Sequence, residues 1–290
     1  AAQCFTAGGV KVIGPNKKGN STDSPVIPES AYLFFVSNQQ IEALAHLAIN
    51  AAETGEPVDK KEAKAVLKSL NSVDIALFGR MVADAPDLNV DAACQVAHAI
   101  STHRAATEFD YFTAVDDEKA RAEDEDAGAG MIGQVEFTSS TLYRFATINV
   151  DQLLENLGSH EVVLEAVNAF VRTFLTSMPT GKQNTFANRT VPEAILVQVR
   201  DSQPVSYANA FETPVRVKQD EGFAERSIQA LVDHSRLLEN SFGFTPLASL
   251  ASASIQHDTD LFAGVATELR FDQLLAELEN VLRPQLVVAS

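Results

Sequence analysis

Apolar residues recur at intervals of three and four over the front of the chain, which is the pattern of amphipathic helices. Residues 38–54 follow this pattern, and Gly55 comes next as a stop signal. A second helix is predicted from about Asp59 to Leu70. Residues 73–81 alternate enough to favour a strand, although a helix also fits. The front of the chain is therefore predicted to be mostly helical.

Strand-like and helix-like patterns are mixed over the rest of the chain. Residues 134–150 alternate between apolar and polar positions, and residues 194–200, AILVQVR, form an apolar run typical of a buried strand. Amphipathic helices are predicted at residues 162–178, 221–239 and 271–282. The mostly apolar stretch 91–103 has no period that decides its structure. Together these patterns predict an α+β fold that carries a helical lobe.

Composition narrows the class of protein. With 290 residues, 46% of them apolar, the chain is long enough for one large domain or two modest ones. It contains no run of 18 apolar residues, so we expect no membrane partner. Cys4 and Cys94 lack metal-site spacing, which favours core positions in a cytoplasmic protein without metal or cofactor. Because no Met precedes Ala1, we expect a fragment whose start lies upstream.

The formal net charge of −17 argues against loose, non-specific binding of nucleic acid, because nucleic-acid binders usually carry a positive surface. It does not exclude a groove lined by a few placed lysines. Lys60, Lys61, Lys64 and Lys68 form such a set, since they share one side of the second predicted helix. A row of lysines is commonly only a solvated helix face, but it also suits a phosphate backbone.

Six sequence blocks stand out in order along the chain. They are DIALFGRM (74–81), QVAHAISTH (95–103), DYFTAVDD (110–117), GMIGQVEFTSSTLYRFATIN (130–149), PTGKQNTFA (179–187) and PVSYANAFE (204–212). Their identity, order and spacing resemble the CasC family, the backbone subunits of type I-E CRISPR surveillance complexes (Cascade). The resemblance is close over residues 60–223 and looser elsewhere.

Membership of this family implies a palm with an RRM-like (ferredoxin-like) fold, a helical insertion called the fingers and a protruding loop called the thumb. The corresponding boundaries are 1–92 for the fingers, 93–107 and 138–290 for the palm, and 108–137 for the thumb. The family's first palm strand precedes the fingers, and we expect it to be absent from this chain.

The resemblance also implies a function. Several copies of the subunit would assemble head to tail into a filament along a guide RNA (crRNA). The resulting ribonucleoprotein would include the other Cascade subunits and would recognise target DNA in antiviral defence. The subunit would hold the RNA and catalyse no reaction.

The block DYFTAVDD suits a loop that separates stacked bases. Unstacking a base is unfavourable, and apolar or aromatic contacts must offset the loss. Tyr111, Phe112 and Val115, with Ile132 on the returning arm, provide such side chains. By the resemblance they match thumb positions that border a displaced base, and Met81 matches a residue that packs nearby. The alternative is that Phe112 and Ile132 are ordinary core residues.

Five polar residues are candidates for further contacts with the guide. Lys182 and Gln183 are donors suited to a phosphate or ribose, in a block that matches the family's palm loop. Arg144 either reaches the guide or satisfies an internal carboxylate. Ser206 and Asn209 are interpreted as palm-surface contacts on a predicted strand.

Two other classes of function are alternatives. A metal-dependent ribonuclease of a related CRISPR backbone family would use His98, His103 and an acid such as Asp110 or Asp116. The histidines are five residues apart, which suits ligands on neither a helix nor a strand, and no HExxH or phosphate-loop motif appears. We therefore interpret His98 as a core or near-core residue. The second alternative is an acidic protein-interaction module that binds no nucleic acid.

Overall fold

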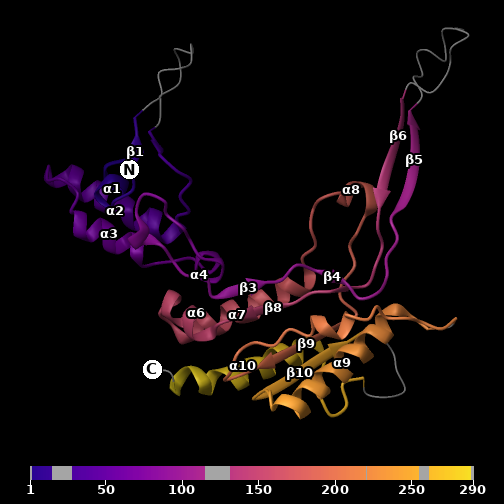
Figure 1. The fold of residues 1–290 in the computed structure, drawn as a ribbon. Helices are drawn as coiled ribbons and strands as arrows, with labels where there is room; N and C mark the ends of the chain where they lie inside the picture. Colours follow the sequence, from indigo (N-terminus) through magenta and orange to yellow (C-terminus); the bar gives the residue numbers. More distant parts are fainter. Residues whose placement is uncertain (1, 15–27, 115–130, 220, 255–260, 289–290) are drawn as a thin grey trace, which may run out of the picture. The chain divides into compact units, whose positions relative to one another are not determined.

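The computed structural model describes residues 2–14, 28–114, 131–219, 221–254 and 261–288. The chain combines helices with small sheets, which confirms the predicted α+β class (Figure 1). It divides into two compact units. Unit 1 consists of residues 1–96, 146–192 and 271–290, and unit 2 consists of residues 97–145 and 193–270. Every helix in the described ranges is too short or too polar to span a bilayer.

The front of unit 1 is helical, as the apolar pattern predicts. Its elements are α1 (Ala2–Ala7), β1 (Val12–Ile13), β2 (Glu29–Ser30), α2 (Asn38–Thr54), α3 (Lys60–Lys68), α4 (Val73–Phe78) and the 3₁₀ helix η1 (Pro86–Leu88). Helix α2 begins at a capping box between Ser37 and Gln40 and ends at Gly55, whose φ is 74°. The predicted end at Gly55 is confirmed.

Residues 73–78 form helix α4 instead of the strand that their alternation favoured. The middle of this helix is buried on all sides, so the segment lacks the polar positions from which its period could be read. Gly79 ends the helix with a φ of 79°. A Cβ at this position would lie only 2.8 Å from the Val90 carbonyl oxygen, so the close approach of the two segments requires glycine.

One apolar core joins the helices of this lobe. Leu44 of α2, Leu67 of α3 and Leu88 of η1 are almost wholly buried in it. Gly8, just after α1, lies so close to Leu67 that a Cβ here would overlap the leucine side chain. Burying a leucine contributes about 1.5–3 kcal/mol relative to leaving it exposed. The shared core therefore fixes η1 against α3.

The other half of unit 1 surrounds a short antiparallel strand pair. Its elements are β3 (Cys94–Val96), its partner β8 (Ala146–Ile148), α6 (Val150–Leu157), α7 (His160–Thr176), α8 (Gln183–Phe186) and α10 (Phe271–Val288). Asn156 of α6 donates to the carbonyls of Ala76 and Asp91, which ties the helical lobe to this half. Cys4 and Cys94 are free and buried, as predicted. Burial raises the pKa of the Cys94 thiol to about 11, so it stays protonated at neutral pH.

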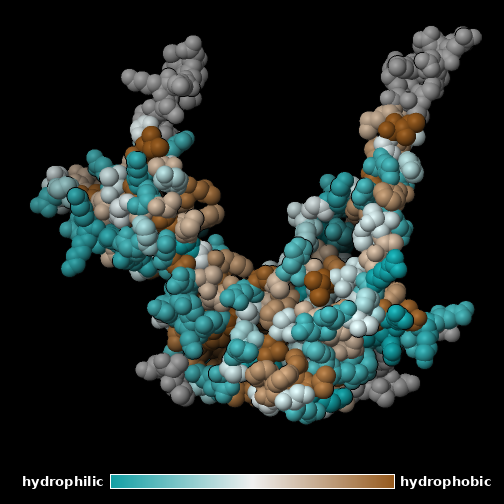
Figure 2. Space-filling view, in the orientation of Figure 1, coloured by the Kyte–Doolittle hydropathy of each residue, from teal (hydrophilic) through white to brown (hydrophobic). Residues whose placement is uncertain are grey.

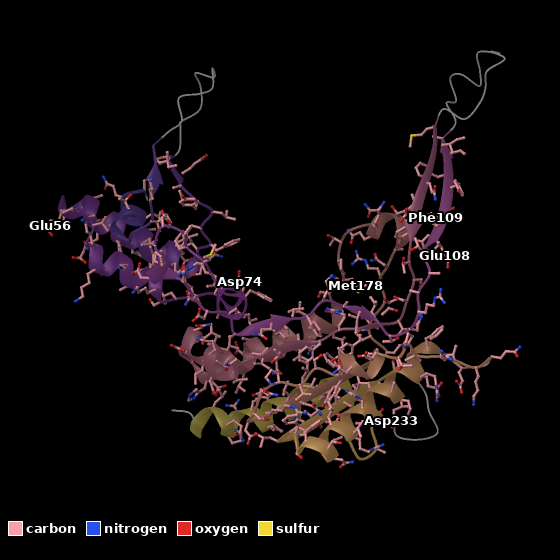
Figure 3. All side chains as sticks on the ribbon, viewed as in Figure 1. Glu56, Asp74, Glu108, Phe109, Met178 and Asp233 are labelled. Carbon is pink, nitrogen blue, oxygen red and sulfur yellow. The ribbon has the colours of Figure 1, made fainter. Side chains whose placement is uncertain are left out.

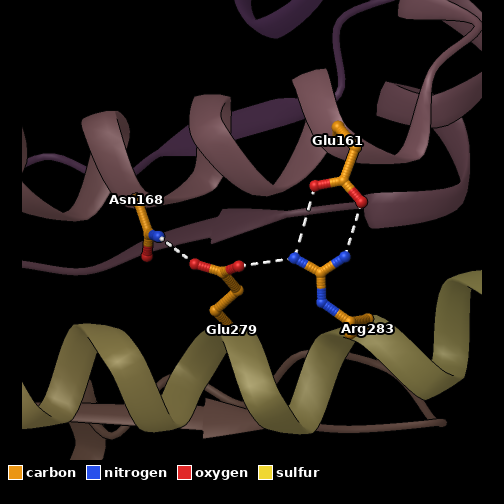
Figure 4. Close-up of polar contacts among 4 residues, drawn as sticks. All are labelled: Glu161, Asn168, Glu279 and Arg283. Atoms are coloured by element: carbon orange, nitrogen blue, oxygen red, sulfur yellow. Dashed lines mark hydrogen bonds and ion pairs between the residues drawn. The ribbon is translucent and has the colours of Figure 1, made fainter.

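Helices α7 and α10 are joined by a polar network on their exposed side (Figure 4). Arg283 donates to both carboxylate oxygens of Glu161, at 2.5 and 3.3 Å, and to Glu279 at 2.6 Å. Asn168 donates to the other oxygen of Glu279 at 3.4 Å. The hydrogen bond from Arg283 lowers the pKa of Glu161 below its ordinary value. The ionised form of Glu161 therefore stabilises the fold.

We expect Glu161→Gln to lower the thermal midpoint at neutral pH by a small amount, on the order of 1 °C, because the pair is exposed. A carboxyl whose pKa is lowered in the folded state contributes above its unfolded pKa, and the contribution is lost as the pH falls through the folded value. The difference between wild type and variant should therefore disappear in strong acid. Thermal unfolding followed by circular dichroism across the pH range measures it. The matched control is Glu165→Gln on the same helix, and an equal effect of both variants would contradict the assignment.

Unit 2 is built on a three-stranded sheet in the order β11-β10-β9, and Figure 1 labels its strands β10 and β9. Its elements are β4 (Ile100–Ser101), β5 (Glu108–Ala114), β6 (Met131–Phe137), β7 (Leu142–Tyr143), β9 (Ala194–Val199), η2 (Ala208–Phe211), α9 (Phe223–Phe242), β10 (Ala248–Ala253) and β11 (Thr267–Glu268). Val232 of α9 packs with Ala251 of β10 and with Phe262 in the core of this unit. Strand β9 is half-buried along its whole length, so its predicted position is confirmed but its full burial is wrong.

Candidate nucleic-acid interface

The hairpin β5–β6 presents apolar side chains to solvent. Every residue of β5 is exposed, and Tyr111 is 70% exposed. On β6, Ile132 is 71% exposed, while Phe112 of β5 is 40% exposed. Figure 2 shows apolar residues gathered at the described end of the hairpin. The alternative that Phe112 and Ile132 are core residues is therefore wrong.

The register of the two strands divides these side chains between two faces. Tyr111 and Ile132 lie on the same face, where the pairing makes them diagonal neighbours. Phe109, labelled in Figure 3, lies two residues before Tyr111 and shares that face. Phe112 lies on the opposite face. The predicted wedge residues are thus brought together only in part, with Tyr111 and Ile132 on one side and Phe112 on the other.

Phe112 covers its cross-strand partner, Gly133. A Cβ at Gly133 would overlap the Phe112 ring, so the ring rests directly on the glycine backbone. Aromatic residues that cover a glycine across a strand pair stabilise the pairing. The hairpin itself therefore accounts for Phe112, but it does not account for Tyr111 or Ile132. Val115, the remaining predicted wedge residue, lies outside the described residues.

The base of the hairpin is fastened to the body of unit 2. Thr102 N–H donates to the Thr141 carbonyl at 3.0 Å, and Thr141 N–H donates to His103 Nε2 at 3.1 Å. His103 Nδ1 lies 2.9 Å from the Arg104 carbonyl oxygen, and the imidazole stacks on Phe223 of α9 with ring centroids 3.8 Å apart. We assign the proton to Nδ1, because this tautomer satisfies both contacts. The two strands therefore leave the body from fixed positions.

The four predicted lysines are all exposed on α3, which begins at Asp59 as its N-cap. Two of the four are paired. Lys64 Nζ lies 2.6 Å and Lys68 Nζ 3.5 Å from the same oxygen, Oδ2 of Asp87. The hydrogen bond from Lys64 lowers the pKa of Asp87, so this carboxylate is ionised at neutral pH. Lys60 and Lys61 have no ion pair within the described part of the chain.

Met81 is 78% exposed and directly follows Arg80, which is only 4% exposed. The Arg80 guanidinium makes five hydrogen bonds of 2.8–3.3 Å. Their acceptors are the carbonyl oxygens of Leu67, Leu88 and Phe35 and the side-chain oxygen of Gln40. Burial lowers the pKa of Arg80, but a guanidinium still keeps its proton at neutral pH. Met81 is thus an apolar side chain presented to solvent from a rigid support.

The predicted palm contacts are divided between the two units. In unit 1, Lys182 is exposed with a φ of 60° at the start of α8, and Gln183 accepts a hydrogen bond from Arg189 at 3.0 Å. In unit 2, Arg144 directly follows β7 and is half-buried.

Ser206 and Asn209 are both exposed in unit 2, but the strand predicted for them is wrong. Ser206 lies in a loop, and Asn209 lies in η2. The chain turns here because the backbone N–H of Tyr207 donates to the hydroxyl of Tyr143 at 3.0 Å, which holds this segment beside β7. Burial raises the pKa of the Tyr143 hydroxyl, so it stays protonated and serves as this acceptor at neutral pH.

The residues of the ribonuclease alternative do not form a metal site in the described ranges. No group of three or more His, Cys, Asp or Glu side chains there is placed to hold an ion. His98 is exposed, so its interpretation as a core residue is wrong. Both nitrogens of His103 face backbone groups, and Asp110 is exposed on the hairpin. Asp116 lies outside the described residues.

Comparison with known proteins places this geometry in a family. A family model described as CT1975-like protein matches residues 3–279. The chain belongs to the CT1975-like family. A chain of a solved "CRISPR RNA-guided surveillance complex, pre-nicking" is similar, with 30% sequence identity and a TM-score of 0.76 over 96% of this chain and 77% of that chain. A chain of a "CRISPR RNA-guided surveillance complex" has 27% identity and a TM-score of 0.64, over 94% of this chain and 97% of that one. No curated protein matches.

These matches confirm the resemblance inferred from the six blocks, that is, to a Cascade-type Cas backbone protein. They support a role for this CT1975-like chain in a Cascade-like complex. Sequence reasoning nevertheless missed three residues that form or support the candidate interface. Phe109 was detectable, because strand periodicity places it on the Tyr111 face. Asp87 and Arg80 gave no such signal, because their partners lie in other elements.

Proposed function

We propose that this CT1975-like protein is a non-catalytic backbone subunit that binds guide RNA in several head-to-tail copies. The hairpin β5–β6 of each copy enters the stack of guide bases and displaces a base at a regular interval. The guide then reads target DNA by base pairing. The observation that carries this proposal is the exposed apolar face of Tyr111 and Ile132 on a hairpin whose base is fastened.

The physical argument begins with the hairpin. A two-stranded ribbon is at best marginally stable alone in water, and a contiguous exposed apolar surface usually marks an interaction site. Stacking of a base on an aromatic side chain contributes about 1–3 kcal/mol and is insensitive to sequence. Such a surface suits a protein that must hold any guide. The RNA-guided complexes that contain the two similar chains support RNA as the partner.

The rest of the chain takes roles that are consistent with base displacement by the hairpin. Residues 1–92 would form the fingers, 108–137 the thumb, and 93–107 with 138–290 an RRM-like palm. The palm would contact the guide backbone through Arg144, Lys182, Gln183, Ser206 and Asn209, and Met81 would pack beside the displaced base. The lysines of α3 would follow the phosphates of target DNA. Because the net charge is −17, most of the surface repels nucleic acid, and binding would depend on these few contacts.

Co-expression with a guide RNA and partner subunits tests the proposal. We expect the purified complex to contain RNA and to protect it from nuclease in a regular ladder, because identical copies contact the guide at identical intervals. Absorbance at 260 and 280 nm and a gel of the extracted RNA measure this. The RNA should have the same length with and without Mg²⁺. An RNA-free complex would contradict guide binding, and Mg²⁺-dependent shortening would favour the ribonuclease alternative.

A further inference from the structure

The lysine row of α3 is not uniformly available to a ligand. Lys60 and Lys61, at the start of the helix, have no ion pair among the described residues. Lys64 and Lys68, one turn apart at its end, both contact Asp87 Oδ2. The carboxylate therefore occupies the position that a phosphate oxygen would take between these two ammonium groups.

The backbone holds Asp87 in place. It is the middle residue of η1, which begins at Pro86. The next residue, Leu88, is 1% exposed and shares the core with Ala63 and Leu67 of α3. The Leu88 carbonyl also accepts two hydrogen bonds from Arg80. The same core therefore fixes the backbone of Asp87 beside the lysines, and its exposed carboxylate contacts Lys64 and Lys68 from there.

We infer that Asp87 is a built-in competitor for the DNA phosphate, which weakens capture of DNA that does not match the guide. The inference rests on the proposed contact between the α3 lysines and target DNA. A phosphate that binds Lys64 or Lys68 must first displace a carboxylate that is already in place. DNA paired to the guide is held by base pairing as well, so it tolerates this cost better than an unmatched duplex does.

Asp87→Asn tests the inference in the complete guide-loaded complex, with a labelled duplex that lacks a match to the guide. The variant keeps the shape of the side chain and removes the negative charge that pairs with both lysines. We expect roughly tenfold tighter binding of the unmatched duplex near physiological salt. Since each neutralised phosphate adds about 0.9 to the slope of log K against log salt, we also expect a slope steeper by about 1–2. A salt titration between about 50 and 200 mM measures both quantities.

Glu62→Gln is the matched control. It makes the same change of charge, on α3 beside the lysines, but breaks no lysine ion pair, since Glu62 has none in the described ranges. We expect Glu62→Gln to change the affinity for unmatched DNA little. If its effect were as large as that of Asp87→Asn, the loss of negative charge alone would explain both results, and the proposed competition would be wrong. In a Lys64→Gln/Lys68→Gln background, Asp87→Asn should have no effect on unmatched DNA. A persistent effect there would also overturn the inference.

Replacement of all four lysines by glutamine separates this inference from the proposed function. Suppose that the four-lysine variant binds DNA more weakly, while Asp87→Asn binds DNA with the same affinity as the wild type. The proposed contact between the lysines and DNA is then correct, and the role inferred for Asp87 is wrong. If the four substitutions leave DNA binding unchanged, the lysine contact is wrong and the inference fails with it. Guide binding should be normal in every variant, and the RNA content of each complex checks this.

Discussion

Replacing Tyr111 and Ile132 together by alanine is expected to abolish the regular displacement of guide bases that we propose, while Phe112→Ala is expected to preserve it. Tyr111 and Ile132 share one exposed face of the hairpin, and Phe112 lies on the other face against Gly133. Chemical probing of the guide bases in the assembled complex measures the effect. In the wild type every displaced base should react, and in the double variant the periodic signal should fall to the level of the stacked bases.

The expected size follows from the cost of unstacking. Opening a base step costs a few kcal/mol and must be offset at every interval along the guide. Stacking of a base on an aromatic side chain contributes about 1–3 kcal/mol. This corresponds to a factor of about 5–150 in the equilibrium between the stacked and the displaced state of each base. Loss of both Tyr111 and Ile132 removes most of this favourable contact free energy. Under the proposed assembly every copy carries the same change, so the losses would add along the guide, and affinity for the guide should fall strongly as well.

Phe112→Ala is the control for damage to the hairpin. It removes an aromatic side chain from the same ribbon and exposes Gly133, so it weakens strand pairing without touching the Tyr111 face. Phe109→Ala should give a partial loss, since Phe109 lies on the Tyr111 face farther from the described end. Equal loss of periodicity in Phe112→Ala and in the double variant would show that only the integrity of the hairpin matters. Retained periodicity in the double variant would refute the wedge.

Helix boundaries were predictable where local chemistry sets them. Gly55 ends α2 because a glycine readily adopts the left-handed backbone that the turn requires, and Asp59 begins α3 because its carboxylate accepts the N–H of Glu62. Both signals lie within a few residues of the boundary. Helix α4 was not predictable from its own pattern, because its middle residues, Ile75, Ala76 and Leu77, are all buried, and the elements that cover them are distant in sequence.

In the candidate site, too, local features were predictable from the sequence, and features that depend on the tertiary fold were not. Adjacent residues of a strand point to opposite faces, so the separation of Tyr111 from Phe112 was available from the sequence once a strand was assumed. The position of Ile132 on the Tyr111 face was not, because it depends on the register between two strands whose connection lies outside the described residues. The pairing of Lys64 with Asp87 depends on the tertiary fold, and no local pattern encodes it.

Arg80→Met is expected to produce the largest loss of stability of the substitutions considered. The variant keeps an unbranched side chain of similar length but removes five hydrogen bonds from a site that is 4% exposed. The Leu88 carbonyl would lose both of its side-chain donors, while the Leu67 carbonyl would keep only the Gln40 amide, which donates to it at 3.1 Å. A buried polar group left unsatisfied costs about 1–3 kcal/mol, and hydrogen bonds from a charged donor contribute about 1.5–3 kcal/mol, so a total loss of about 3–5 kcal/mol is expected. Urea unfolding followed by circular dichroism measures it.

The effect should extend to function through Met81, which follows Arg80 directly. Arg80 draws together α2, α3 and η1, because its acceptors come from residues in and beside all three elements. Without it, the exposed Met81 loses its rigid support, and hydrogen exchange should rise across residues 80–90. Under the proposed function, the guide base beside Met81 should then become more mobile even in complexes that still assemble.

Two further variants decide whether the hydrogen bonds of Arg80 carry this effect. Arg226→Met makes the same replacement at an exposed position on α9, where the guanidinium lies 3.5 Å from Glu221, and it should change stability little. Arg80→Lys keeps the charge but cannot reproduce the planar fork of donors, so it should also destabilise the protein strongly. Wild-type stability of Arg80→Lys would mean that charge alone suffices at this position. The network of carbonyl acceptors would then not be what holds the helical lobe together.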